Sequence, residues 1–308
     1  MFSVAQEIAE LRDAGAITAE QAAPLIAQQK REVVSLYAEL RFLTWAAVML
    51  IVTGVGVLVK NHLDEIGPLA IAVAITLGAA GCYAWAIYKR TRTASLVDDY
   101  ILLLAALLLS ADLGYIEHTW HLLGANWKEH LLILAVIHGV TAYAFGSRLV
   151  LSVSIASLAA YLGVQRSLDT IWGSSRDTAI RGFACAAIVI TWRLLDARFR
   201  KSRTFAPVFD HYAANLAFWS SLILSADKDL RLLGCAIALA LAAASAIYGV
   251  KTHSEMFVIY ACVYGVIALD IAVVNLAPDL AAFFIMMSAV VAVVSLFLIH
   301  AHMRKEEA

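Results

Sequence analysis

The feature that most constrains this chain is a series of apolar runs, each about 17–22 residues long, separated by short polar breaks. An α-helix rises 1.5 Å per residue, so a run of this length crosses the roughly 30 Å hydrocarbon core of a bilayer. The chain is 62% hydrophobic and only 15% charged, whereas about 25% of the residues of a soluble domain are charged. We therefore predict an all-α fold, a polytopic bundle of transmembrane helices.

The positions of the apolar runs predict about ten spans within a transmembrane domain of residues 42–302. With this count, 16 of the 23 Lys and Arg residues lie on the side of the N-terminus and 7 on the other. Basic residues accumulate on the cytoplasmic side of a membrane protein. We therefore predict that both termini are cytoplasmic, including a short tail at residues 303–308. The predicted spans are residues 42–59, 69–88, 100–120, 131–145, 149–164, 179–195, 212–224, 230–250, 256–274 and 280–300.

Residues 1–41 are more polar and predict a cytoplasmic amphipathic helical hairpin followed by a lead-in helix. The second helix of the hairpin begins at Thr18, and Gln21 follows at the spacing of a capping box. Two interpretations stay open for residues 1–31. The hairpin either lies on the membrane face as a peripheral cap or binds a protein partner or a second copy of the chain.

The sequence shows no features of a nucleic-acid-binding protein and none of the common catalytic or cofactor-binding motifs. The net charge of −1 provides no basic field, so we expect no nucleic-acid partner. No P-loop, dinucleotide-binding glycine motif or nucleophile elbow is present. We therefore expect no enzyme, no catalytic residue and no cofactor. The cysteines fall singly in predicted spans, as packing residues do; they are Cys82, Cys185, Cys235 and Cys262.

Ionisable and amide side chains inside the predicted spans each require an explanation, because a charge there costs roughly 2.5–3.5 kcal/mol. Asp112 lies in the third span and His138 in the fourth. Neighbouring antiparallel spans would bring both to mid-membrane, so we predict an Asp112–His138 pair, either a proton relay or a structural interhelical bond. Asp270, near the end of the ninth span, and Asn215, in the seventh, are further intramembrane polar candidates.

A polar cluster follows the third span, on the predicted outer side. Glu117 and His121 are four residues apart and share a helix face. Histidines and a carboxylate can bind zinc, but no HExxH motif is present, so we predict an interfacial collar and no metal site. The members of this outer-interface cluster are Glu117, His118, His121, Trp127 and His130. Beyond it, we expect Arg193 to pair with Asp196, three residues later on the same helix.

Three short motifs occur in a characteristic order. The first is AGAITAEQ at residues 14–21, the second KNHLDEIGP at 60–68, and the third EHTWHLLGANW at 117–127. Together they resemble an uncharacterised family of predicted bacterial membrane proteins, domain of unknown function 2157, over roughly residues 1–165. His121, Gly124 and Trp127 stand at family positions, whereas His118 stands where the family has Gln. The resemblance implies a multi-pass protein of the bacterial inner membrane and implies no activity.

Three functions remain after these steps. The best interpretation is a transporter-like protein for a small solute or for protons. The first alternative is a non-catalytic membrane scaffold, sensor or assembly partner that acts through its hairpin. The second is an enzyme acting on lipid or envelope material at the outer face. An aqueous cavity reaching Asp112 and His138 would favour transport. A dry, tightly packed bundle with an exposed apolar hairpin face would favour the scaffold, and an outer cleft joining Glu117, His121 and Asp270 would favour the enzyme.

Overall fold

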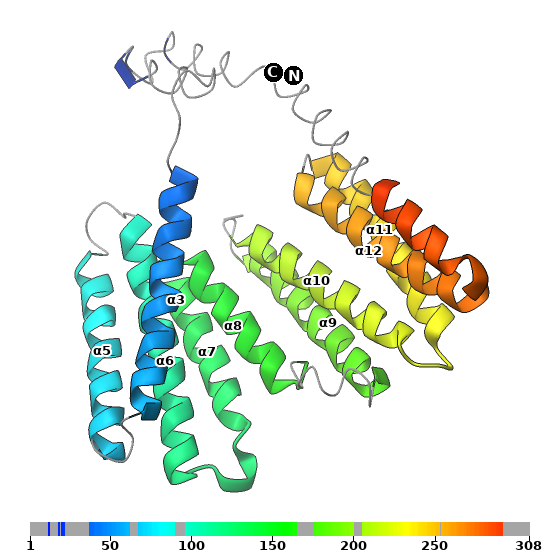
Figure 1. Cartoon of the computed structure of the whole chain (residues 1–308). Coiled ribbons are helices and arrows are strands. Elements are labelled where there is room, and N and C mark those ends of the chain that lie inside the picture. The colour runs from blue at the N-terminus through cyan, green and yellow to red at the C-terminus, as the bar shows by residue number, and fades with distance from the viewer. Residues whose placement is uncertain are drawn as a thin grey trace. The chain divides into compact units, whose positions relative to one another are not determined.

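The computed structural model describes residues 37–61, 67–89, 96–164, 175–199, 205–252 and 254–291, together with residues 12, 18, 20 and 21. Within these residues the elements are helices and no strand occurs, so the predicted all-α fold is confirmed (Figure 1). The helices are α3 (Tyr37–Asn61), α5 (Pro68–Lys89), α6 (Leu96–Trp120), the short 3₁₀ helix η1 (Gly124–Asn126), α7 (Glu129–Phe145), α8 (Arg148–Tyr161), α9 (Ser175–Phe199), α10 (Ala206–Ser225), α11 (Arg231–Thr252), α12 (Glu255–Leu276) and a further helix at Pro278–Val291.

Contacts divide the chain into two compact units, one of Thr44–Leu241 and one of Met1–Leu43 with Ala242–Ala308. The unit of Thr44–Leu241 contains three helix pairs that are consecutive in sequence, α5 with α6, α7 with α8, and α9 with α10. Helix α8 also contacts α6, α9 and α10, so it is the central helix of this unit. The predicted boundaries after residues 41 and 302 stay predictions.

The largest buried cluster of the Thr44–Leu241 unit surrounds α8. Val150, Leu151 and Ile155 of α8 are completely buried and pack with Val189 of α9 and Phe209 of α10. The turn that leads into α8 forms where we predicted it, at residues 146–148. Gly146 ends α7 in the left-handed conformation at φ 72°, and the Ser147 hydroxyl then caps α8 by accepting a hydrogen bond from the amide of Val150.

Over the residues that the structure describes, each predicted span overlaps a helix, but the number ten is not confirmed. Five helices of the described part are long and apolar enough to cross a membrane: α5, α6, α9, α11 and α12. Helices α7 and α8 have 17 and 14 residues, or about 26 and 21 Å of rise. Both are therefore shorter than the roughly 30 Å hydrocarbon core. The protein is a membrane protein with several spans.

Some glycines of the described helices lie at close helix approaches and others do not. A Cβ added at Gly54 or Gly56 of α3 would meet nothing within 4 Å. At Gly234 of α11, in contrast, an added Cβ would lie 2.4 Å from the Ser225 amide nitrogen of α10. Small residues allow backbones to approach in membranes, but the sequence did not show which glycines are used.

Most of the predicted hairpin, residues 1–31, lies outside the described residues, as does the tail at 303–308. Thr18 and Gln21 are described. The Gln21 amide donates to the Thr18 hydroxyl at 3.2 Å, and the Thr18 amide donates to Gln21 Oε1 at 2.9 Å. These reciprocal bonds confirm the predicted capping box.

Candidate functional site

Asp112 is buried in α6 and binds a hydroxyl of the neighbouring helix. It is 4% exposed, and its Oδ2 lies 2.6 Å from the Thr76 hydroxyl of α5. Asp112 Oδ1 is buried and has no hydrogen-bond partner among the described residues. A buried acceptor without a partner in a membrane is costly, so this carboxyl group is a candidate functional group.

His138 is completely buried in α7 and binds a different hydroxyl. Its Nε2 lies 2.8 Å from Ser110 Oγ of α6, and its Nδ1 has no partner within the described part of the chain. The predicted direct Asp112–His138 bond is therefore not formed. The two side chains are on adjacent helices, as expected, but each has one polar atom bonded to a hydroxyl that was not among the predicted site residues.

Both hydroxyls have a second acceptor one helical turn earlier. The Thr76 hydroxyl lies 2.9 Å from the Ala72 carbonyl oxygen, and the Ser110 hydroxyl lies 2.9 Å from the Ala106 carbonyl oxygen. A hydroxyl has one proton and two lone pairs, so it donates either to its own helix or to the titratable partner. Each hydroxyl can thus turn between the carbonyl oxygen of its own helix and the side chain of the neighbouring helix.

Ser110 also lines an open cavity of about 490 Å³ in the Thr44–Leu241 unit. Its walls come from α3, α6, α7, α8 and α10, and they are mainly aliphatic. The polar groups of the wall are three serine hydroxyls, one phenol and one imidazole: Ser110, Ser152, Ser157, Tyr212 and His130. His138 lies behind Ser110, one hydrogen bond from the cavity.

The outer-interface cluster divides into one buried carboxyl and several exposed rings. Glu117 is 7% exposed, and its Oε2 accepts a hydrogen bond from the Leu123 amide at 3.0 Å. This bond holds the turn that follows α6. His121 and Gly124 of that turn have positive φ values of 50° and 54°, a conformation that is uncommon for residues other than glycine. The two motif positions therefore shape a turn.

The rings of the cluster do not converge on a common point. His118, His121 and Trp127 are exposed, and the His118 and His121 ring centroids are 6.5 Å apart. His130 Nδ1 contacts the Trp127 carbonyl oxygen. Among the described residues, no three His, Cys, Asp or Glu side chains are placed to hold a metal ion. The exposed tryptophan and histidines are typical of a membrane interface.

The last two intramembrane polar candidates make local contacts and are not among the residues that line the cavity at Ser110. Asp270 of α12 accepts a hydrogen bond from Ser288 at 2.7 Å, within the unit that contains the C-terminus. Asn215 of α10 donates to the His211 carbonyl oxygen of its own helix at 2.8 Å. The expected pairing of Arg193 with Asp196 is wrong, because the Arg193 guanidinium forms a two-pronged ion pair with Asp210 of α10.

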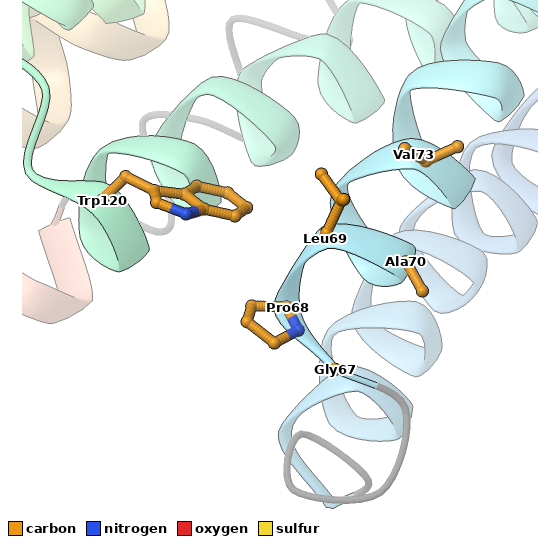
Figure 2. Close-up of a pocket in the computed structure, with 6 residues that line it drawn as sticks. All are labelled: Gly67, Pro68, Leu69, Ala70, Val73 and Trp120. Carbon is orange, nitrogen blue, oxygen red and sulfur yellow. The ribbon is translucent and has the colours of Figure 1, made fainter.

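A second hollow, of about 550 Å³, lies between the start of α5 and the end of α6. Figure 2 shows the Trp120 indole at one side of it, facing Pro68 and Leu69 across the opening. No buried polar side chain lines this hollow among the described residues. It is a crevice at the helix ends, where aromatic rings accumulate in membrane proteins.

The comparison with known families decides the resemblance. Residues 9–151 match the family described as predicted membrane protein (DUF2157). The match confirms the family resemblance of the N-terminal part of the chain and its membrane nature. No curated protein matches the chain, and no solved structure matches it.

The DUF2157 match extends from the hairpin to the first turn of α8. It includes Asp112, His138 and the whole outer-interface cluster, whereas Asn215 and Asp270 lie beyond it. Sequence reasoning missed Thr76 and Ser110, because single hydroxyl residues are common in membrane helices. The one available signal was that Ser110 stands two residues before Asp112.

Proposed function

We propose that this membrane protein is transporter-like and moves protons, alone or together with a small solute. One observation carries the proposal: the cavity wall contains Ser110, and the Ser110 hydroxyl is hydrogen-bonded to the buried His138. Ionisable side chains inside a membrane generally mark ion or proton pathways. The arrangement supplies a cavity, a hydroxyl that can turn, and an imidazole that can hold a proton.

The hydrogen-bond geometry supports a relay at this position. If the Ser110 hydroxyl donates to Ala106, its oxygen accepts from His138 Nε2–H, and Nδ1 is then a bare acceptor. If the hydroxyl instead donates to Nε2, Nδ1 carries the proton. Nδ1 is buried and has no partner in either tautomer among the described residues, so the proposed relay requires a water molecule that reaches Nδ1 and takes or delivers the proton. Asp112 and Thr76 form a second unit of the same kind on α5 and α6.

The proposal includes no catalytic step and no cofactor. Glu117 is buried and its Oε2 accepts a hydrogen bond from the Leu123 amide, while His118 and His121 are exposed. This separation gives no support to an enzyme at that surface. Residues 1–31 remain the proposed contact for a protein partner or for self-association.

Proton flux through reconstituted vesicles tests the function. Vesicles with the full chain and an internal pH dye receive a potassium diffusion potential, and the rate of internal pH change is measured. We expect faster flux than in protein-free vesicles, and a roughly tenfold lower rate for His138→Gln and for Ser110→Ala because the transfer path is interrupted.

Thr191→Ala is the matched control for this measurement. The exposed Thr191 hydroxyl donates to the Ala187 carbonyl one turn earlier, like Ser110, but it lines neither hollow. This variant should retain the wild-type rate. A wild-type rate equal to that of protein-free vesicles, or unchanged rates in both relay variants, would contradict the proposal.

We further propose a bacterial inner-membrane location with both termini in the cytoplasm, on the basis of the Lys and Arg distribution. Single cysteines in a background with the native cysteines replaced by alanine test the orientation. An impermeant maleimide applied from outside should label Asn126→Cys and Lys228→Cys, both in exposed turns, and not Arg148→Cys. Labelling of Arg148→Cys from outside would contradict the proposed topology.

A further inference from the structure

The cavity at Ser110 is lined by few ionisable side chains. Among the described lining residues there is no Asp, Glu, Lys or Arg, and the ionisable ones are His130 and Tyr212. An ion that leaves water needs opposite charge or several hydrogen-bond partners, and without them the desolvation cost is large. The wall offers hydroxyls and long aliphatic surfaces instead, so its chemistry matches a neutral molecule with a large apolar part.

The shape of the cavity follows one face of α8. Its lining includes Leu149, Ser152, Val153, Ala156, Ser157 and Ala160 of that helix, a spacing of three and four residues. The face extends over about 16 Å at 1.5 Å per residue. One leaflet is about half of the roughly 30 Å hydrocarbon core, so the groove has the length over which a single acyl chain extends.

The surroundings indicate that the occupant enters from the lipid. The cavity is open, and Trp45 of α3 lines it while remaining 43% exposed. A large apolar side chain that is exposed on a membrane helix contacts acyl chains, so the open side of the cavity at Trp45 faces lipid.

We propose that this cavity binds a neutral single-chain lipid, an uncharged amphiphile of the monoacylglycerol type. The acyl chain lies along the small side chains of α8, with Ala156 at the middle of the groove, and the hydroxyl or carbonyl groups of the lipid bind the serine hydroxyls. This inference rests on the proposed function, because it takes the cavity beside Ser110 as the solute site and names the class of solute.

Photolabelling of the full chain in vesicles tests the assignment. The probe is a monoacylglycerol with a diazirine in its acyl chain, and labelled peptides are mapped with and without excess unlabelled monoacylglycerol. We expect competed labelling of α8 and of the α3 segment that contains Trp45 and Met49. Ala156→Trp fills the groove and should lower the competed labelling about fivefold, a change of ~1 kcal/mol. Ala156→Leu is the milder variant if the indole prevents folding.

Ala184→Trp is the matched control, because Ala184 is exposed on α9 and does not line the cavity. It should leave the labelling unchanged. Uncompeted labelling spread over all lipid-facing helices would overturn the proposal, and so would equal competition by an anionic fatty acid or by glycerol. The two proposals can fail separately. Proton flux without competed labelling would contradict the lipid ligand alone. Competed labelling without proton flux would contradict the transport function alone.

Discussion

Gly234→Ala lowers the free energy of unfolding by about 3 kcal/mol, near the upper end of the cost of overpacking. The added Cβ would lie 2.4 Å from the Ser225 nitrogen, 2.8 Å from the Ser225 Cα and 2.8 Å from the Ser221 carbonyl oxygen. All three are backbone atoms of α10, so no side-chain rotation relieves the clash and α11 must move away. Thermal or SDS-induced unfolding of the purified protein in detergent measures the loss.

Gly54→Ala is the matched control for this substitution. Gly54 is also inside an apolar helix, but its added Cβ meets nothing within 4 Å. Alanine is the better helix former by up to about 1 kcal/mol, so this variant should be as stable as the wild type or more stable. Equal stability of Gly234→Ala and Gly54→Ala would show that α10 and α11 do not approach as closely as the structure indicates.

Arg193→Asp produces the second large effect, a loss of about 2–3 kcal/mol. The Arg193–Asp210 pair joins α9 to α10, and the reversal puts two carboxylates where an ion pair stood. The side chains are 30% and 18% exposed, so water screens part of the repulsion and the loss stays below that of a fully buried pair. The same unfolding measurement in detergent reports it.

Two double variants identify the true partner of Arg193. Arg193→Asp with Asp210→Arg restores the ion pair in reverse and should recover at least half of the lost stability. Arg193→Asp with Asp196→Arg should not, because the carboxylates at 193 and 210 still face each other. If the substitution Asp196→Arg rescues stability and Asp210→Arg does not, then Arg193 pairs with Asp196, and the observed pair with Asp210 is refuted.

The partner of Arg193 shows that residue spacing along one helix is not enough to predict an ion pair. Asp196 stands three residues from Arg193 and Asp210 seventeen. Residues three or four apart on a helix are neighbours, so sequence reasoning selects the local partner. The structure selects Asp210 because α9 and α10 form an antiparallel pair that brings the start of α10 beside the end of α9.

The sequence predicted the two titratable residues of the candidate site. It did not predict the hydroxyl groups to which they are hydrogen-bonded. Asp112 and His138 were identified because an ionisable side chain inside an apolar run is conspicuous. Thr76 and Ser110 were not, since a hydroxyl in a membrane helix usually bonds the carbonyl of its own preceding turn. Both hydroxyls do so here and also reach a titratable side chain on a neighbouring helix.

The turn after α6 was easier to recognise in the sequence than the contacts between helices. Two residues of the third sequence motif, His121 and Gly124, have positive φ values in the structure. A short motif that sets a turn is local, so it is visible in a sequence. The contact that holds this turn, between Glu117 and the Leu123 amide, spans only six residues.

The sequence by itself determined that the chain enters a membrane, that it is helical, and which stretches of the described residues contain a helix. Helical hydrogen bonds join residues four apart, and lipid offers the backbone no other partners, so this information is local. The tertiary structure alone decided which faces meet. Every face of these helices is apolar, so hydropathy gives no preferred rotation about a helix axis, and successive residues point about 100° apart. Rotation decides that Gly234 and not Gly54 is pressed against a backbone, and that Asp112 meets Thr76 and His138 meets Ser110.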